Sequence, residues 1–233
     1  MIELKRIGTV NSCYKEKFGV PRQPGLVTEA KGYIELLPPY NREEIIRGLD
    51  GYSHLWIQFI FHETMEQGWS PMVRPPRLGG NAKVGVFASR SMFRPNPIGL
   101  SVVKIESIDC TQGVKINISG MDLVDGTPVI DIKPYIPYVD SISDADGGYA
   151  PEAPETVCNV HFSEESLNQI NKIKDKYVFD LQLLITQVLQ SNPAPAYKGQ
   201  DAAREYGMKL LDFDLKWRQV AADKIEVISL SLF

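Results

Sequence analysis

Short apolar segments, separated by proline and glycine turns, fill the first 140 residues and constrain the fold more than any other feature. A helix is indicated there only at residues 41–49, with Asn41 as N-cap and Ile45, Ile46 and Leu49 as its apolar face. Closely spaced strands with few helices are typical of a barrel or a sandwich and do not fit alternating βαβ units. Strands are predicted at residues 2–10, 33–37, 53–62, 83–88, 101–108 and 114–118.

Two of these strands have further features. The run SHLWIQFIFH at residues 53–62 is dense in β-branched and aromatic side chains, so we expect a strand buried on both faces. The strand at residues 33–37 places Tyr33, Glu35 and Leu37 on one face and ends at Pro38-Pro39.

The composition changes at residues 140–155, where DSISDADGGYAPEAPE is acidic and rich in glycine, proline and alanine. We therefore predict a barrel domain at residues 1–140, a linker at 141–155 and a small α+β domain at 156–233. The last domain should contain a strand at 156–162, a helix capped by Ser163, a second helix capped by Asp180 and stopped at Pro193, and a hairpin that turns near 221–224.

Several classes are disfavoured by composition. No apolar run approaches the roughly 18 to 20 residues of a membrane helix, and the N-terminus lacks the apolar core of a signal peptide. Cys13, Cys110 and Cys158 are three cysteines without a CxxC pair, which favours a reducing compartment over a disulfide framework. A cytoplasmic location is expected.

The net charge of −4 is unevenly distributed. The 39 residues between Glu66 and Glu106 contain no acid and carry six cations, which leaves −10 for the remainder of the chain. A local basic field on an acidic body suits a polyanion or an anionic cofactor, although a solvated loop face could show the same pattern.

Common catalytic motifs are missing. The sequence has no GxGxxG after a strand, no GxxxxGK[ST] and no GxSxG, so a doubly wound nucleotide site has no anchor. His54 and His62 would lie roughly 26 Å apart on a regular strand, at about 3.3 Å per residue, and could not share a metal ion. No metal site is expected.

Three stiff, polar loops stand out instead. Residues 18–26 (FGVPRQPGL) offer Arg22 and Gln23 from a proline- and glycine-bound loop. Residues 74–101 present four arginines on a backbone restricted by Pro-Pro and Pro-Asn-Pro, and residues 122–140 place Asp122, Asp125 and Asp131 close to the turn Asp125–Pro128. Such loops often only turn the chain, but three of them on one scaffold favour an anionic or nucleoside-like ligand.

These segments resemble a known family. FGVPRQPG, GYSHLW, RPPRLGGN, GVFASRSMFRPNPIGLS and DLVDGTPVIDIKPYIPY are similar, in this order across residues 1–140, to motifs of the TrmO/YaeB-like tRNA methyltransferases, which contain the TsaA-like domain. The C-terminal part resembles the extension of the longer bacterial members. The sequence NPAPAY at residues 192–197 departs from the family pattern, because Ala194 stands where an arginine is expected.

The resemblance implies the fold and the reaction. The fold would be mainly β, with a single-sheet, non-Rossmann β-barrel that binds S-adenosylmethionine and a small C-terminal α+β domain. The protein would form a homodimer and methylate N6 of N6-threonylcarbamoyladenosine (t6A), the nucleoside 3′ to the anticodon in tRNA.

The resemblance also implies the site residues. Catalytic candidates are His62, Asp122 and Asp125. Cofactor contacts are expected from Pro21, Arg22, Gln23, Pro24, Gly25, Leu26, His62, Glu63, Arg90, Leu100, Asp122, Leu123, Val124, Asp125, Gly126 and Thr127. Substrate contacts are expected from Arg74, Arg77, Arg94 and Asn96.

Roles within this set stay open. Arg90 or Arg22 could hold the methionine carboxylate, and Asp125 or Asp122 the ribose. The substrate nitrogen should lose its proton during attack, with His62 or an aspartate as the base, although His62 could equally only cap its strand. Arg77 or Arg94 could meet the threonyl carboxylate, and the bulky rings of Phe93 or Tyr138 could stack on the base.

Two rival functions remain at this point. One is a barrel that binds RNA or nucleotides without catalysis, and the other is a methyltransferase with a different substrate.

Overall fold

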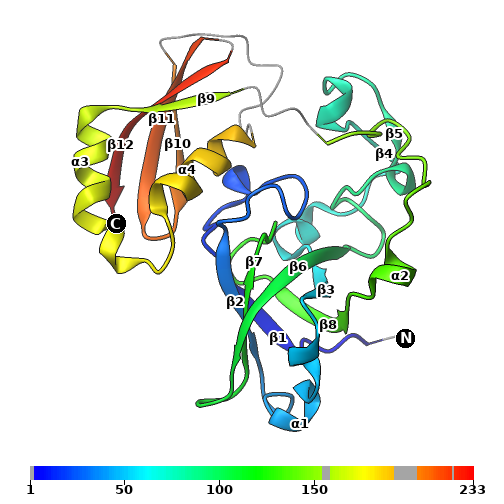
Figure 1. The fold of residues 1–233 in the computed structure, drawn as a ribbon. Coiled ribbons are helices and arrows are strands. Elements are labelled where there is room, and N and C mark those ends of the chain that lie inside the picture. Colours follow the sequence, from blue (N-terminus) through cyan, green and yellow to red (C-terminus); the bar gives the residue numbers. More distant parts are fainter. Residues whose placement is uncertain (1–2, 154–157, 192–203, 222) are drawn as a thin grey trace. The chain divides into compact units, whose positions relative to one another are not determined.

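The computed structural model describes residues 3–153, 158–191, 204–221 and 223–233 (Figure 1). The chain divides into two compact units. The first, here called the barrel unit, holds the described residues within 1–11, 33–118 and 126–154. The second, here called the α+β unit, holds those within 12–32, 119–125 and 155–233. Two internal segments, residues 12–32 and 119–125, thus belong to the same unit as the C-terminal residues.

Six strands of the described chain close into a barrel in the order β1-β2-β7-β6-β3-β8. Antiparallel ladders join β3 to β6 and to β8, and β1 to β2 and to β8. The predicted β-barrel is therefore confirmed. The strands are β1 (Gly8–Asn11), β2 (Lys31–Leu36), β3 (His54–Ile60), β6 (Ile98–Asp109), β7 (Lys115–Ser119) and β8 (Pro128–Pro134).

Alternate side chains of the barrel strands point inward and form the barrel core. Along β3 every second residue is buried, namely Leu55, Ile57 and Phe59. The Phe59 ring lies across Gly99 of β6, its register partner, where an added Cβ would come within 2.1 Å of the ring. Gly99 therefore leaves the space that an aromatic side chain needs in the core.

Short elements complete the barrel unit. β4 (Met72–Val73) pairs with β5 (Val84–Gly85), and two single-turn helices follow other strands, α1 (Glu43–Ile46) and α2 (Pro137–Asp140). No helix among the described residues combines the length and hydropathy needed to cross a membrane.

The α+β unit contains a four-stranded sheet in the order β10-β11-β12-β9 and two helices. The predicted caps are confirmed, because the Ser163 hydroxyl accepts from the Ser166 amide and the Asp180 carboxylate from the Leu183 amide. The elements are β9 (Asn159–Phe162), α3 (Glu164–Ile173), α4 (Leu181–Gln190), β10 (Glu205–Leu210), β11 (Phe213–Ala221) and β12 (Lys224–Leu232).

Several local predictions were wrong. Burial in β3 alternates, since a barrel strand has one face toward the core, so residues 53–62 are not buried on both faces. For the same reason Ile34 and Leu36, rather than Tyr33 and Leu37, are the buried residues of the strand at 31–36.

The ends of other elements also differ. Asn41 is not a cap, and α1 is a single turn with Ile45 exposed, because four residues cannot build an apolar face. Residues 83–88 pair only at Val84–Gly85 before a 3₁₀ turn (η5, Val86–Ala88). The first strand begins at Gly8, and Leu4 is exposed. β8 and β10 were missed.

Some predictions concern residues that the structure does not describe. These are Ile2, the start of the strand at 156–162, Pro193, the NPAPAY segment with Ala194, and part of the turn near 221–224. The domain limits at residues 140 and 156 stay a prediction.

Candidate functional site

The first loop singled out in the sequence and the start of the third, residues 21–26 and 122–125, both belong to the α+β unit. The Gly25 amide donates to the Gly120 carbonyl (2.8 Å), and the Gly120 amide donates to the Ala30 carbonyl (3.0 Å). Both glycines have positive φ, and a Cβ on Gly120 would lie 3.6 Å from the Gly25 Cα. The loop of residues 21–26 is therefore fixed by main-chain bonds against the start of the 119–125 segment. We call these two segments the cradle.

Asp125 at the end of this segment is engaged on both carboxylate oxygens. Oδ1 accepts from the Ser12 amide (2.8 Å), and Oδ2 pairs with Lys15 Nζ (2.9 Å). The Asp125 amide in turn donates to the Tyr14 carbonyl (2.8 Å). The carboxylate thus ties residues 12–15 to the cradle, and about two of its roughly four lone pairs stay available for further donors.

A buried pair precedes the cradle. Cys13 and Tyr14 are almost completely inaccessible to solvent. Burial raises the pKa of the Cys13 thiol to about 12, and burial together with the charges of Cys13 and Asp122 raises the pKa of Tyr14 further above its usual value. The buried Tyr14 hydroxyl has no hydrogen-bond partner of ordinary geometry among the described residues.

Arg22 is the cation of the cradle. Partial burial lowers the pKa of its guanidinium, which stays protonated at neutral pH. Within the part of the chain that the structure describes, no hydrogen bond or ion pair engages this side chain. Arg22 is exposed overall, and a guanidinium without a partner among the described residues fits the carboxylate of an amino-acid moiety, so the cradle fits S-adenosylmethionine.

The remaining cradle residues divide into packed and accessible ones. Pro21 and Leu123 are buried and hold the two loops to their unit. The others are half-buried or exposed: Gln23, Pro24, Gly25, Leu26, Asp122 and Val124.

Other predicted cofactor residues lie in the barrel unit. His62 opens a 3₁₀ turn (η3, His62–Gln67) just beyond β3 and is half-buried, while the next residue, Glu63, is exposed. Leu100 lies on the outer face of β6 and is 52 % exposed. Gly126 and Thr127 extend the cradle's second loop into β8, and the Val10 amide donates to the Thr127 carbonyl (2.9 Å).

The arginine segment is supported by short turns rather than by core packing. Arg74, Arg77 and Arg90 are exposed, and so is Asn96. Arg77 donates to the Glu152 carbonyl. Side chains here are presented to solvent on a frame of two-residue strands, a 3₁₀ turn at Pro76–Leu78 (η4) and η5.

Arg94 differs from these three arginines. It is half-buried, and its Nη1 donates to the carbonyls of Val86 (3.1 Å) and Ser89 (2.7 Å). Its guanidinium carbon lies 5.6 Å from the Phe87 ring centre. These contacts give Arg94 a structural role in its own loop, in addition to the predicted role with substrate.

The aromatic candidates differ in exposure. Tyr138 is 89 % exposed, whereas Phe93 is half-buried. Phe87, which sequence reasoning did not select, is 77 % exposed.

Sequence reasoning also missed Ser12, Tyr14 and Lys15. A signal was available, because an aspartate in a loop needs donors and Lys15 lies three residues before the first motif. Their distance of more than a hundred residues from Asp125 hid the pairing.

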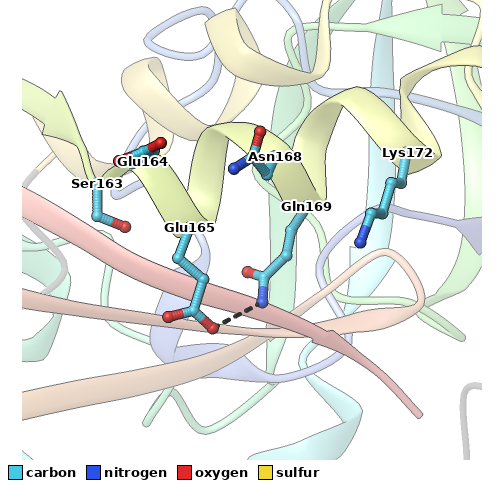
Figure 2. Close-up of a pocket in the computed structure, with 6 residues that line it drawn as sticks. All are labelled: Ser163, Glu164, Glu165, Asn168, Gln169 and Lys172. Atoms are coloured by element: carbon cyan, nitrogen blue, oxygen red, sulfur yellow. Dashed lines mark hydrogen bonds between the residues drawn. The ribbon is translucent and has the colours of Figure 1, made fainter.

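A surface hollow runs along α3 and holds none of the predicted residues. Figure 2 shows that it is lined by Ser163, Glu164, Glu165, Asn168, Gln169 and Lys172, with Gln169 hydrogen-bonded to Glu165. Two carboxylates beside the helix start disfavour an anionic ligand there. No group of three metal-ligating side chains is found among the described residues.

Two family models of known proteins match successive parts of the sequence. The family model described as "tRNA-methyltransferase O N-terminal domain" matches residues 9–141, and the one described as "TrmO C-terminal domain" matches residues 155–232.

Individual relatives match over most of their length. The chain is 50 % identical over 218 residues to the tRNA (adenine(37)-N6)-methyltransferase of Escherichia coli K12, covering 93 % of this chain and 92 % of the relative. It is 45 % identical over 170 residues to the enzyme of that name from Eikenella corrodens, covering 72 % and 90 %. A crystal structure of TrmO from Pseudomonas aeruginosa superposes with a TM-score of 0.83 at 36 % identity, covering 99 % of this chain and 98 % of that chain. The chain therefore belongs to the TrmO family of tRNA methyltransferases.

Proposed function

We propose that this protein transfers a methyl group from S-adenosylmethionine to N6 of adenosine 37 in tRNA, and that the adenosine methylated is t6A. The observation that carries the proposal is 50 % identity, over 93 % of the chain, to a tRNA (adenine(37)-N6)-methyltransferase. The cradle supports it, because it offers the Arg22 guanidinium, which has no hydrogen-bond or ion-pair partner among the described residues, beside loops that are fixed by their main chain.

The bound cofactor supplies an electrophilic methyl group on a sulfonium, and the residues of this chain supply alignment. Arg22 binds the methionine carboxylate through its planar fork of donors. Asp122 or Asp125 accepts from the ribose hydroxyls, and the two oxygens of Asp125 also bond to Ser12 and Lys15. Asp125 acts by holding residues 12–15 in place.

His62 is the candidate base. The proton on the substrate nitrogen must leave during attack, and a neutral imidazole accepts a proton at neutral pH. The engaged carboxylate of Asp125 is a poorer candidate for this step. His62 is half-buried in the turn that follows β3, so its ring is partly accessible to solvent.

The arginine segment serves the tRNA. Arg74, Arg77 and Arg90 are exposed on an acid-free stretch, as phosphate contacts require. One guanidinium of the segment meets the threonyl carboxylate, and the exposed ring of Tyr138 or Phe87 stacks on a nucleobase of the single-stranded loop. We further propose a homodimer located in the cytoplasm.

The test is methyl transfer in vitro. The purified protein is incubated with S-adenosylmethionine and with tRNA from cells in which its gene is deleted, and the digested nucleosides are separated by mass spectrometry. We expect t6A to be replaced by a species one methyl group heavier. A His62→Asn variant should bind the cofactor normally and lose most of the turnover.

Two outcomes would decide against the proposal. If a different nucleoside gains the methyl group, the substrate is wrong. If tRNA binds but S-adenosylmethionine does not, the chain is an RNA-binding barrel without this chemistry.

A further inference from the structure

The loop that carries Arg22 is anchored at both of its ends by the α+β unit. Residues 13–19 precede the loop and residues 28–30 follow it, and each stretch has its own contacts with C-terminal elements. A loop held at both ends has fewer conformations to lose on binding a ligand.

The anchor before the loop is provided by β10 and β11. The Leu211 amide donates to the Cys13 carbonyl (2.7 Å), and Tyr14 forms an isolated bridge with Leu210. Phe18 stacks on Trp217 of β11 with ring centres 6.0 Å apart. The Lys209 amide adds a bond to Glu16 Oε1 (3.0 Å).

The stretch after the loop is held at Ala30 by the Gly120 amide and, from the C-terminal elements, by a side chain of α4, Gln187. Its Oε1 accepts from the Glu29 amide (3.0 Å), and its Nε2 donates to the Thr28 hydroxyl (3.0 Å). Gln187 is half-buried, and the helix packs through other residues, such as Leu184 and Val188, which are inaccessible. The side chain can therefore be changed without disturbing the core of the unit.

We propose that Gln187 is a positioning residue, which acts on cofactor binding through Thr28 and Glu29 and thereby fixes the loop of residues 21–26. The C-terminal part of the chain then contributes to the methyl-donor site as well as to any contact with tRNA. This inference rests on the proposed function of the cradle.

The test compares matched variants of one helix. Gln187→Met keeps the length of the side chain and removes both hydrogen bonds. Gln187→Glu keeps the acceptor for the Glu29 amide and serves as the conservative rescue. Gln190→Met is the control, because Gln190 lies on the same helix and donates instead to the Cys158 carbonyl (3.2 Å).

Two measurements are made on the full-length protein. Hydrogen exchange without ligand reports on the Glu29 amide, and calorimetry gives the dissociation constant of S-adenosylmethionine. In Gln187→Met we expect exchange at Glu29 and the dissociation constant each to rise about fivefold, which corresponds to one hydrogen bond of ordinary strength. Turnover at saturating cofactor should change less than twofold, since the chemical step is not altered.

The outcomes separate this inference from the proposed function. Faster exchange at Glu29 with unchanged cofactor affinity would show an anchor that does not position the loop, and would overturn the proposal. An equal loss of affinity in Gln190→Met, or no recovery in Gln187→Glu, would overturn it as well. If the wild type does not bind S-adenosylmethionine at all, the proposed function has failed, and the exchange data alone still show whether Gln187 holds the segment.

Discussion

The cradle and the arginine segment are held in contrasting ways, each within its own unit. Main-chain hydrogen bonds and a buried anchor at Cys13 and Tyr14 support the cradle. The arginine segment rests on two-residue strands and 3₁₀ turns, and most of its cations are exposed. The first arrangement restricts the backbone near Arg22, whereas the second presents long, mostly exposed side chains from short elements.

The difference matches two kinds of recognition. A small ligand gains affinity when its contacts are already in place, because little ordering is left to complete on binding. A polyanion is attracted by charge in many geometries, and its affinity depends on salt. We therefore expect the cradle to be sensitive to packing changes and the arginine segment to be sensitive to charge changes.

The largest effect is expected from removing the central aromatic side chain of the α+β unit. Trp217 is 1 % exposed and stacks on Phe18 and Tyr206. Trp217→Ala should lower the free energy of unfolding of this unit by about 3–5 kcal/mol, since it leaves a large cavity. Denaturant unfolding and hydrogen exchange at residues 13–19 measure the loss.

The matched control lies in the barrel unit. Trp56 on β3 is half-buried beside Tyr135, with ring centres 5.8 Å apart. Trp56→Ala should cost less and leave exchange at residues 13–19 unchanged. If both variants loosen those residues equally, the two units do not respond separately to packing changes.

The next largest effect concerns Arg22. Arg22→Ala should weaken S-adenosylmethionine binding about tenfold or more, because a charge-assisted contact to a carboxylate is lost. Arg22→Lys should retain part of the affinity for S-adenosylmethionine, since lysine keeps the positive charge but lacks the planar fork of donors. Calorimetry measures both, and unchanged affinity in Arg22→Ala would remove Arg22 from the site. Binding of tRNA should be affected less than in variants of the exposed arginines.

A pH effect should separate the units further. Burial raises the pKa of Cys13 to about 12 from an ordinary value of 9.0, so the folded protein keeps a proton that the unfolded chain loses above pH 9. The contribution of the Cys13 thiol to the free energy of unfolding is complete below pH 9 and falls by about 1.4 kcal/mol per pH unit between pH 9 and 12. Unfolding free energies of Cys13→Ala should therefore depend less on pH in this range.

Cys110 provides the control for this measurement. It is half-exposed in the turn that follows β6 of the barrel unit. Cys110→Ala should keep the alkaline slope of the wild type. The interpretation of Cys13 is wrong if its variant also keeps that slope.

The smallest effect is expected for one exposed arginine. Arg74→Ala should weaken tRNA binding about two- to threefold and reduce the slope of log affinity against log salt by about 0.7 to 0.9, the value for one phosphate contact. Affinity for S-adenosylmethionine should not change. Lys104→Ala is the control, because Lys104 already pairs with Glu106 (3.1 Å), and a salt titration that cannot distinguish the two variants would contradict the assignment.

Local patterns accounted for much of the fold. Sequence patterns predicted five of the six barrel strands and missed β8. Ser163 and Asp180 predicted the starts of both longer helices, because a cap is a contact within a few residues. The apolar face of the second helix is buried at Leu181, Leu184, Ile185, Val188 and Leu189. Errors gathered where short segments were read in isolation, as with Asn41 and the second half of residues 83–88.

The sequence by itself determined the class of fold, the motifs of the family and the residue types available for the ligand. Only the tertiary structure decided which of them meet. Asp125 pairs with Ser12, 113 residues away in the sequence, and with Lys15. Gln187 bonds to Glu29, which is 158 residues away. Propensity and periodicity act over a few neighbouring residues, whereas these contacts form when sheets and helices pack and bring distant segments together. The loop that carries Arg22 thus received its anchors from the other end of the chain.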